Sequence, residues 1–346
     1  MAFVHYTVKK IVHGLGAIKE AANEVKNLKG SKAFIVTDPG LAKIGVQKPL
    51  EEALTAGGIE WKLYAEAQLE PSMDSIQHCT DEAKAFGADV IIGFGGGSSM
   101  DCAKATAARI AKPHQSLAQM KGILKVHKKL PLLIAIPTTA GTGSETTLAA
   151  VITDAETRHK YAINDFPLIP RYAVLDPKVT LSLPPFITAT TGMDALTHAV
   201  EAYIGNSTTP GTRKNALDAV QLIFENLDTA YTDGNNIEAR RNMLRASYFA
   251  GCAFTKSYVG YVHAIAHSLG GKYNVPHGLA NAVILPMVLE TYGDSITHKL
   301  RNLAVAAGLC DKNEDDKTAS RMFIDAVKDM KKRFGIGDYI PEIQET

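Results

Sequence analysis

Short apolar runs alternate with segments of helical pattern through the first half of the chain. The apolar runs occupy residues 32–38, 60–66, 89–97, 132–139 and 172–177. Segments such as residues 41–58 ("LAKIGVQKPLEEALTAGG") separate them. Short buried strands that alternate with helices are typical of a mainly parallel sheet with crossover helices. The pattern therefore predicts an α/β domain.

The pattern changes near "LSLPP", which ends at Pro185. From Pro184 onward, long helical segments rich in Ala, Leu, Glu and Lys replace the apolar runs, and β-branched runs become rare. We therefore expect an α/β domain over residues 1–183 and an all-α domain over residues 184–346.

Composition narrows the class of protein. Of the 346 residues, 46% are hydrophobic and 21% charged, which is typical of a globular protein. The formal charge of +1 gives no general attraction for nucleic acid or anionic lipid, so neither is an expected partner. The chain lacks a signal-peptide pattern and an apolar run long enough for a bilayer, and its four cysteines are scattered. We expect a cytoplasmic protein with reduced thiols.

A glycine-rich turn follows the third apolar run. In "DVIIGFGGGSSMDCAKATAARIA", Gly95, Gly96 and Gly97 let the backbone approach a ligand, and the helix opening at the serines offers N–H groups to a pyrophosphate. The spacing matches neither common phosphate-binding motif. A tight turn in which Ser98 and Asp101 cap the helix is the alternative.

Asp38 ends the first apolar run and precedes a Pro-Gly pair. A carboxylate at this place can accept hydrogen bonds from a ribose and repel a 2′-phosphate, which favours NAD over NADP. In the usual dinucleotide fold, however, this acid follows the glycine loop, and here it precedes the loop. A simple turn-forming role for Asp38 stays open.

A second loop of small residues, "AIPTTAGTGSE", also follows an apolar run. Its hydroxyls at Thr138, Thr139, Thr142 and Ser144 suit a loop folded over a polar ligand. A hydroxyl-rich surface loop would have the same composition. The position at a strand end, where parallel sheets bind ligands, favours the binding role.

Three of the eleven histidines lie in "HAIAHSLGGKYNVPH", residues 263–277. His263 and His267 are four residues apart and so share one face of a helix. We expect the Gly270-Gly271 pair to end that helix and His277 to lie on a Pro-His-Gly turn. The spacing suits a metal site, but imidazoles hydrogen-bonded within an apolar core would show it too.

An earlier segment, "TATTGMDALTHAVEAY", places Asp194 and His198 four residues apart on a second helical face. Two such pairs with His277 are hard to explain by core packing and favour a metal. One carboxylate with imidazoles suits Fe²⁺ or Zn²⁺. An alcohol bound at such a metal loses its proton more readily, and the alkoxide can expel a hydride.

Four motifs, "GGGSSMDCAK", "PTTAGTGSE", "ATTGMDALTHAVEAY" and "VHAIAHSLGGKYNVPHGLANAVILP", occur together in this order. With them the chain resembles the iron-dependent (group III) alcohol dehydrogenases from near Gly14 to its end. The resemblance implies that a small primary alcohol or diol is oxidised to the aldehyde with NAD and Fe²⁺, or alternatively Zn²⁺. It also implies a homodimer or larger homo-oligomer.

The resemblance also implies roles for single residues. Asp194, His198, His263 and His277 match the metal ligands, whereas His267 matches a catalytic histidine beside the nicotinamide. Helical spacing alone leaves open whether His263 or His267 is the ligand. The implied cofactor contacts are Asp38, Gly95, Gly96, Gly97, Ser98, Asp101, Thr138, Thr139, Thr142 and Lys160.

The chain departs from the family pattern at two places. Met287 stands where many relatives carry a histidine, and relatives continue through further helices, so the family's C-terminal helices are expected to be absent. Two other functions stay open. A sugar-phosphate cyclase resembling dehydroquinate synthase would need clustered Lys and Arg, but the residues between the motifs are mostly apolar. A non-catalytic nucleotide-binding protein is the second.

Overall fold

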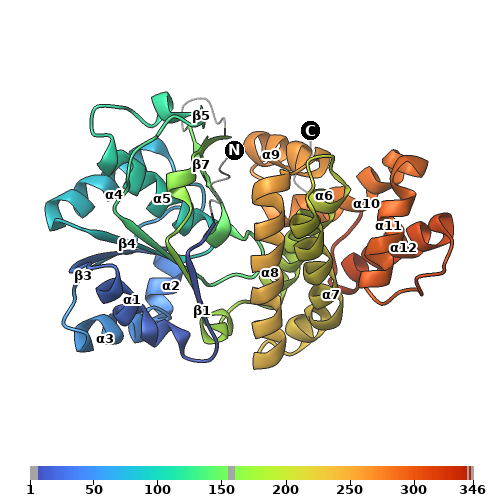
Figure 1. The fold of residues 1–346 in the computed structure, drawn as a ribbon, viewed down its shortest axis with the longest axis horizontal. Helices are drawn as coiled ribbons and strands as arrows, with labels where there is room; N and C mark the ends of the chain where they lie inside the picture. The colour runs from blue at the N-terminus through green and yellow to red at the C-terminus, as the bar shows by residue number, and fades with distance from the viewer. Residues whose placement is uncertain (1–6, 155–159, 341–342, 344–346) are drawn as a thin grey trace. The chain divides into compact units, whose positions relative to one another are not determined.

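The structure, a computed structural model, describes residues 7–154, 160–340 and 343. It divides into two units with separate hydrophobic cores (Figure 1). The first unit comprises the described residues up to Thr138 together with residues 144–180, and the second comprises residues 139–143 and the described residues from Leu181 onward. The short segment 139–143 therefore packs with a unit other than the one that flanks it in sequence.

A six-stranded sheet forms the centre of the first unit. Its strands are β1 (Lys10–His13), β2 (Lys32–Val36), β3 (Glu60–Tyr64), β4 (Val90–Gly95), β6 (Leu132–Pro137) and β9 (Tyr172–Leu175). They lie in the order β1-β9-β6-β4-β2-β3, and every pair is parallel. The carboxyl ends of all six strands therefore meet at one edge of the sheet.

Alternate residues of the central strands enter two different cores. Phe34 and Ile91 pack in one cluster with residues of α4 (Met73–Phe86) and α5 (Gly97–Ala111). Ile35 and Ile92 pack in the other with residues of α1 (Ala21–Asn27) and α3 (Lys48–Ala56). Because both faces are covered by helices, the strands are apolar throughout, as is typical of parallel sheets.

A smaller sheet completes the first unit. It consists of β5 (Gly122–Ile123), β8 (Lys160–Asn164) and β7 (Ala149–Thr153), with β7 and β8 antiparallel. The sequence did not predict these strands or β1. The five expected strands are all present, and the predicted class, a parallel α/β sheet followed by helices, is confirmed.

Seven α-helices build the second unit in the part of the chain that the structure describes. They are α6 (Pro185–Ile204), α7 (Pro210–Thr232), α8 (Ile237–Ser257), α9 (Tyr261–Tyr273), α10 (His277–Tyr292), α11 (Thr297–Ala306) and α12 (Asp316–Arg333). From Thr188 onward α6 is buried almost throughout, so its polar side chains must find partners inside the unit. Across the described residues, no helix has the length and apolar character to cross a membrane.

Two expectations about the histidine-rich segment were wrong. The glycine pair does not end the helix: α9 runs through Gly270 and Gly271 to Tyr273, and Asn274 takes the left-handed conformation at its end (φ 56°). His277 does not lie on a turn, because Pro276 caps α10 and His277 is the first residue of that helix. His277 therefore has a helical backbone to fix its direction.

Candidate active site and metal centre

The glycine loop leaves the sheet at the carboxyl end of β4. Gly95 has a φ of 152°, and a Cβ there would lie 2.5 Å from Ser99 Oγ. Both facts restrict the position to glycine, because an L side chain would be strained and would also collide with Ser99. The chain can therefore turn directly from β4 into α5.

The first turn of α5 has free backbone N–H groups. Gly96 is the N-cap residue, no side chain accepts a hydrogen bond there, and the first turn holds no acid. The alternative of Ser98 and Asp101 as a capping pair is wrong, because Asp101 accepts from Ser144 Oγ and Val151 N instead, each at 3.2 Å. An uncapped helix start favours an anionic ligand.

Asp38 lies beside this loop although it precedes it by far in sequence. It follows β2, which pairs directly with β4, so both segments emerge at the same edge of the sheet. One carboxylate oxygen accepts a hydrogen bond from Leu41 N at 3.0 Å and caps α2 (Pro39–Ile44). The turn-forming role is thus real, and the second oxygen is left for another partner.

The predicted cofactor residues of the second loop fall into both units. Thr138 donates its backbone N–H to Gly95 O at 3.0 Å, which places it beside the glycine loop in the first unit. Thr139 and Thr142 belong to the second unit. The hydroxyl of Thr139 is buried without a hydrogen-bond partner. An unpartnered buried hydroxyl fits a group that accepts a ligand.

Lys160, on β8, forms an ion pair with Glu70. The residue before Glu70, Leu69, accepts a hydrogen bond at its carbonyl oxygen from the Ser98 hydroxyl. Two consecutive residues therefore connect Lys160 to the start of α5. This arrangement connects Lys160 to the start of α5, with a carboxylate on its ammonium group.

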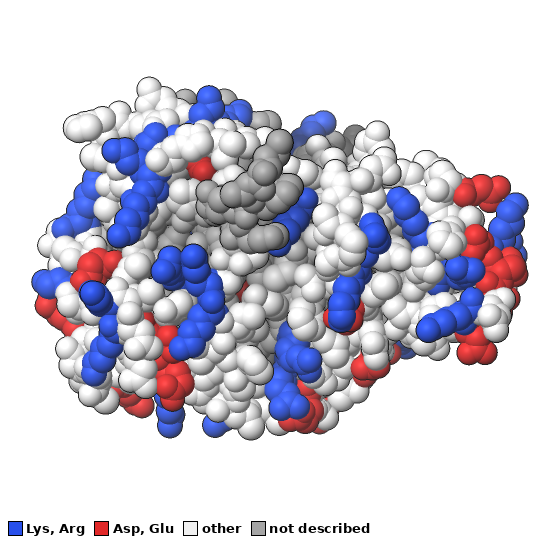
Figure 2. Space-filling model, viewed as in Figure 1, with Lys and Arg blue, Asp and Glu red and all other residues white. Residues whose placement is uncertain are grey.

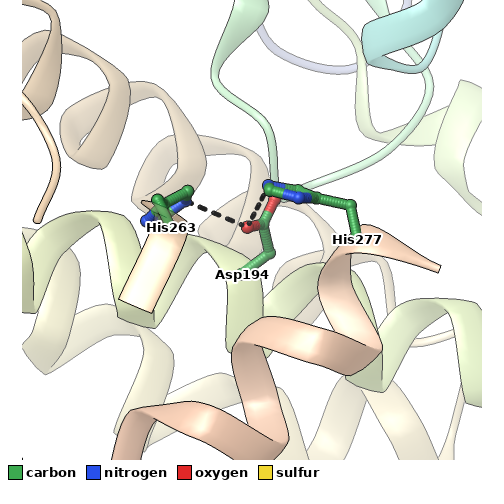
Figure 3. Close-up of side chains that lie close together, drawn as sticks. All are labelled: Asp194, His263 and His277. Atoms are coloured by element: carbon green, nitrogen blue, oxygen red, sulfur yellow. Dashed lines mark ion pairs between the residues drawn. The ribbon is translucent and has the colours of Figure 1, made fainter. Parts of the chain in front are cut away.

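Three side chains from three helices converge in the second unit. Asp194 on α6, His263 on α9 and His277 on α10 have ligand-type atoms within 4.8 Å of one another. Asp194 Oδ1 lies 3.6 Å from His263 Nε2 and 3.5 Å from His277 Nε2. Figure 3 shows the two imidazoles on either side of the carboxylate. One carboxylate with two imidazoles is a donor set for a divalent transition metal.

His198 lies next to this group but outside it. Its Nδ1 is 3.8 Å from Asp194 Oδ1 and is buried without a hydrogen-bond partner. Its ring stacks on Phe254 with centroids 4.1 Å apart. Burial lowers the pKa of His198 to about 4, more than the charge of Asp194 raises it. A neutral imidazole with an unpartnered nitrogen is suited to bind a metal.

Charges are strongly coupled inside this cluster. Burial would raise the pKa of the Asp194 carboxyl, but His198, His277 and His263 together hold it well below its ordinary value. Burial would lower the pKa of His263, but hydrogen bonds to Asp194 and Glu201 raise it to about 9. The cluster therefore stabilises positive charge beside the Asp194 carboxylate.

Asn281 is a site residue that sequence reasoning missed. Its amide nitrogen donates to Asp194 Oδ1 at 2.7 Å and lies 3.2 Å from His263 Nε2 and 3.1 Å from His277 Nε2. It is fully buried. The signal was available, because Asn281 follows His277 by four residues and so shares its helical face.

His267, the expected catalytic histidine, lies at the exposed side of the cluster. Its ring centroid is 5.0 Å from that of His277 and 6.1 Å from that of His263. Helical spacing had left His263 and His267 as equal candidates for the ligand. Burial separates them, because His263 is only 2% exposed.

Two buried charges behind the cofactor loops were also missed. Lys104 Nζ lies 2.6–3.1 Å from five oxygens of Ser144, Thr147 and Ala149, which share its three N–H donors and tie this segment to α5. Glu145 is buried, and both of its carboxylate oxygens lack a hydrogen-bond partner. Burial raises the pKa of Glu145 to about 7 against the opposing charge of Lys104. Lys104 ends the motif "GGGSSMDCAK" and Glu145 ends "PTTAGTGSE", but neither motif indicates that its last residue is a buried charge.

Comparison with known proteins gives the same class from independent information. The model of the iron-containing alcohol dehydrogenase family matches residues 8–177, and the model of the C-terminal part of the Fe-containing alcohol dehydrogenase family matches residues 188–343. The chain belongs to the iron-containing alcohol dehydrogenase family, so the resemblance found in the sequence is confirmed.

Three individual relatives are informative. The sulfoacetaldehyde reductase of Bilophila wadsworthia is 52% identical over 335 residues, which are 96% of this chain and 85% of that protein. The crystal structure of a 1,3-propanediol oxidoreductase is 36% identical with a TM-score of 0.92 and covers 97% of this chain and 88% of its own. The sulfoacetaldehyde reductase of Bifidobacterium kashiwanohense, solved with NAD⁺, is 28% identical with a TM-score of 0.88, covering 100% and 89%.

Proposed function

We propose that this enzyme transfers a hydride between a small primary alcohol and NAD⁺ at a divalent metal, giving the aldehyde, NADH and a proton. The observation that carries the proposal is that three imidazoles surround one carboxylate oxygen, Asp194 Oδ1. His263 Nε2 lies 3.6 Å from it, His277 Nε2 3.5 Å and His198 Nδ1 3.8 Å. Membership of a family named for iron favours Fe²⁺, with Zn²⁺ as the alternative that the same donors accept. A divalent ion held by these residues supplies Lewis acidity toward an alcohol oxygen.

The residues of the first unit have a consistent role in binding the cofactor. We assign the pyrophosphate to Gly95, Gly96 and Gly97 with Ser98, since α5 starts there without a cap. Asp38 would accept the hydroxyls of the adenosine ribose with its free oxygen. The remaining assigned contacts are Asp101, Thr138, Thr139, Thr142 and Lys160. Lys160 would have to leave its ion pair with Glu70 to contact the cofactor.

His267 has a separate role from the ligands in this proposal. It lies beside His277 but at the exposed side of the cluster. An imidazole there can accept the alcohol proton and pass it to water, which is general base catalysis. This division makes Asp194, His198, His263 and His277 the metal ligands and His267 the catalytic residue.

The proposed substrates are small aldehydes and their primary alcohols. We place sulfoacetaldehyde and 2-hydroxyethanesulfonate first, because a sulfoacetaldehyde reductase is 52% identical over 96% of this chain. Propanediol and short unbranched alcohols follow. The names of the relatives favour a dehydrogenase over the cyclase considered above.

The test is turnover after metal reconstitution. The chelated protein, loaded in parallel with Fe²⁺ under argon or with Zn²⁺, is assayed at 340 nm for NAD⁺ reduction by each alcohol and NADH oxidation by each aldehyde. We expect activity only with metal, and a preference for NAD over NADP. Equal rates before and after chelation, or no turnover of any alcohol or aldehyde, would overturn the proposal.

We further propose a cytoplasmic homo-oligomer of two or more chains. All four cysteines are thiols rather than disulfides, as is usual in a reducing compartment. Basic and acidic side chains are interspersed on the face in Figure 2, and the formal charge is +1, so nucleic acid is not a proposed partner. Light scattering on the eluted protein tests the oligomer: a mass of 37.1 kDa would identify a monomer.

A further inference from the structure

One buried carboxylate of the second unit has no role among those that the resemblance implies. Glu201 lies on α6, seven residues after Asp194, and is 4% exposed. Its Oε2 is 2.6 Å from His263 Nδ1, the ring nitrogen that faces away from Asp194. The imidazole of His263 therefore lies between two carboxylates.

The hydrogen bond to Glu201 determines how His263 presents its other nitrogen. An ionised carboxylate only accepts hydrogen bonds, so His263 Nδ1 must carry the proton. When a metal replaces the second proton of the ring, the lone pair that binds it is on Nε2, and Nε2 is the atom that faces Asp194 at 3.6 Å. A carboxylate that accepts a hydrogen bond from the ring nitrogen not bound to the metal fixes the ring and increases the basicity of the nitrogen that binds the metal.

Glu201 is itself fixed by the start of α9. Its Oε1 accepts a hydrogen bond from Val262 N at 2.7 Å. Glu201 thus provides the acceptor that the N-terminus of α9 lacks in its own residues.

Gly260 leaves the space that this carboxylate occupies. A Cβ at Gly260 would lie 2.8 Å from Glu201 Oε1 and 3.3 Å from Glu201 Cδ. A side chain there would push the carboxylate away from α9. Gly260, Glu201 and His263 therefore form one continuous contact from the start of α9 to the cluster.

We propose that Glu201 is a positioning residue of the metal centre, which orients His263 and strengthens its bond to the metal, and that Gly260 is required to admit it. The inference rests on the proposed function in one respect, that His263 binds a divalent metal. It adds that metal affinity depends on a carboxylate that does not touch the metal.

The experiment measures metal affinity directly. Chelated wild type and the variants Glu201→Ala, Glu201→Gln and Gly260→Ala are titrated with Zn²⁺ against a chromophoric chelator, and with Co²⁺ while its visible absorption is recorded. Glu24→Gln is the matched control, because Glu24 is also a buried carboxylate, paired with Lys10 in the first unit.

We expect Glu201→Ala to weaken Zn²⁺ binding by about 10–100-fold and to alter the Co²⁺ spectrum. Glu201→Gln retains an acceptor for Nδ1–H but loses the charge, so its loss should be smaller, about tenfold. Gly260→Ala should weaken binding in the same direction. Glu24→Gln should bind like the wild type.

A purely structural role for Glu201 as a cap of α9 predicts a different pattern. The melting temperature of the metal-free variants would fall while Zn²⁺ affinity and the Co²⁺ spectrum stayed unchanged, and this result would overturn the inference. If Glu201→Ala does not fold, Glu201→Gln and Gly260→Ala decide the matter. Failure of the wild type to bind metal would instead refute the proposed function.

Discussion

At the scale of single residues, Asn281 contacts all three members of the cluster of Asp194, His263 and His277. Its amide group lies within 3.2 Å of Asp194 Oδ1 and of the Nε2 atoms of His263 and His277. Asn281 therefore helps to fix the positions of these three side chains.

Asn281→Ala should therefore destabilise the metal-free protein more than the metal-loaded protein. Without metal, the buried Asp194 loses a hydrogen bond worth about 1–3 kcal/mol, whereas a bound cation compensates the carboxylate directly. Melting temperatures with chelator and with saturating Zn²⁺ measure the difference. We expect a larger rise on Zn²⁺ addition than in wild type, and an equal fall in both states would contradict this explanation.

His267 tests the separation of the catalytic residue from the ligands. His267→Ala should retain its metal and lose about 10²–10⁴ in rate, which is the usual range for a general acid or base. His263→Ala should lose metal and activity together. Metal analysis of the purified variants beside their kinetics measures both quantities, and a His267→Ala protein without metal would reverse the assignment.

Asp38 tests the choice of cofactor. Asp38→Asn keeps an oxygen to cap α2 but removes the charge that would repel a 2′-phosphate. We expect the ratio of kcat/KM for NAD over NADP to fall by about tenfold or more. The reason is that the Asp38 carboxylate would no longer repel the 2′-phosphate of NADP, and such a repulsion between like charges costs several kcal/mol. Asp38→Gly, which also removes the cap, should change the ratio likewise and lower the melting temperature. An unchanged ratio in both variants would remove Asp38 from the cofactor site.

At the scale of elements, the central strands were predictable and the smaller sheet was not. β2 and β4 are buried on both faces, so their sequences are continuous apolar runs. β7 and β8 alternate between buried and half-buried positions over only five residues each, and β7 begins with two alanines, which gives a weak signal. The end of α9 was also not predictable from sequence. Gly270 is buried within the helix, whereas a glycine usually indicates where a helix ends.

The metal ligands of the site could be predicted from the sequence, but the hydrogen bonds that hold the site residues in place could not. Asp194 and His263 stand in motifs with chemical meaning, and their spacing was informative. Glu201 and Lys104 act through hydrogen bonds to distant segments, and only the fold brings those partners together. Charged residues in a helical pattern are usually on the surface, so burial is the information that the sequence lacked.

Glu145, in the segment that follows β6, allows the effect of burial on a carboxyl pKa to be tested by changing the pH. The pKa of Glu145 is raised from its ordinary value of 4.5 to about 7, mainly by burial. Between these values the native state holds a proton that the unfolded state has lost. The free energy of unfolding therefore falls as pH rises from 4.5 to 7, by about 3 kcal/mol for this group, and the loss persists above pH 7.

Glu145→Gln cannot lose that proton. The free energy of unfolding of the variant, relative to wild type, should therefore rise by about 3 kcal/mol from pH 4.5 to pH 8. Urea unfolding of both proteins at the two pH values measures this difference, and the comparison cancels the other titrating groups. The same difference at both pH values would show that the carboxyl has an ordinary pKa.

At the scale of the whole molecule, the proposed metal site and the proposed pyrophosphate site lie in different units. The donors Asp194, His198, His263 and His277 all lie in the helical unit, and the uncapped start of α5 lies in the α/β unit. A ligand that binds only the folded state stabilises what it binds by RT ln(1 + [L]/Kd), about 2.7 kcal/mol at one hundred times Kd. Binding of metal should therefore protect the helical unit in particular.

Amide hydrogen exchange with and without metal tests this last prediction. Chelation should speed exchange in α6, α9 and α10, whose side chains supply the donors, while β4 and β6, at the centre of the parallel sheet, keep their protection. NAD⁺ added to the chelated protein should slow exchange at the first turn of α5. Equal acceleration of β4 and α6 on chelation would show that the two units unfold as one, and an unchanged first turn of α5 with NAD⁺ would place the cofactor elsewhere than we have assigned it.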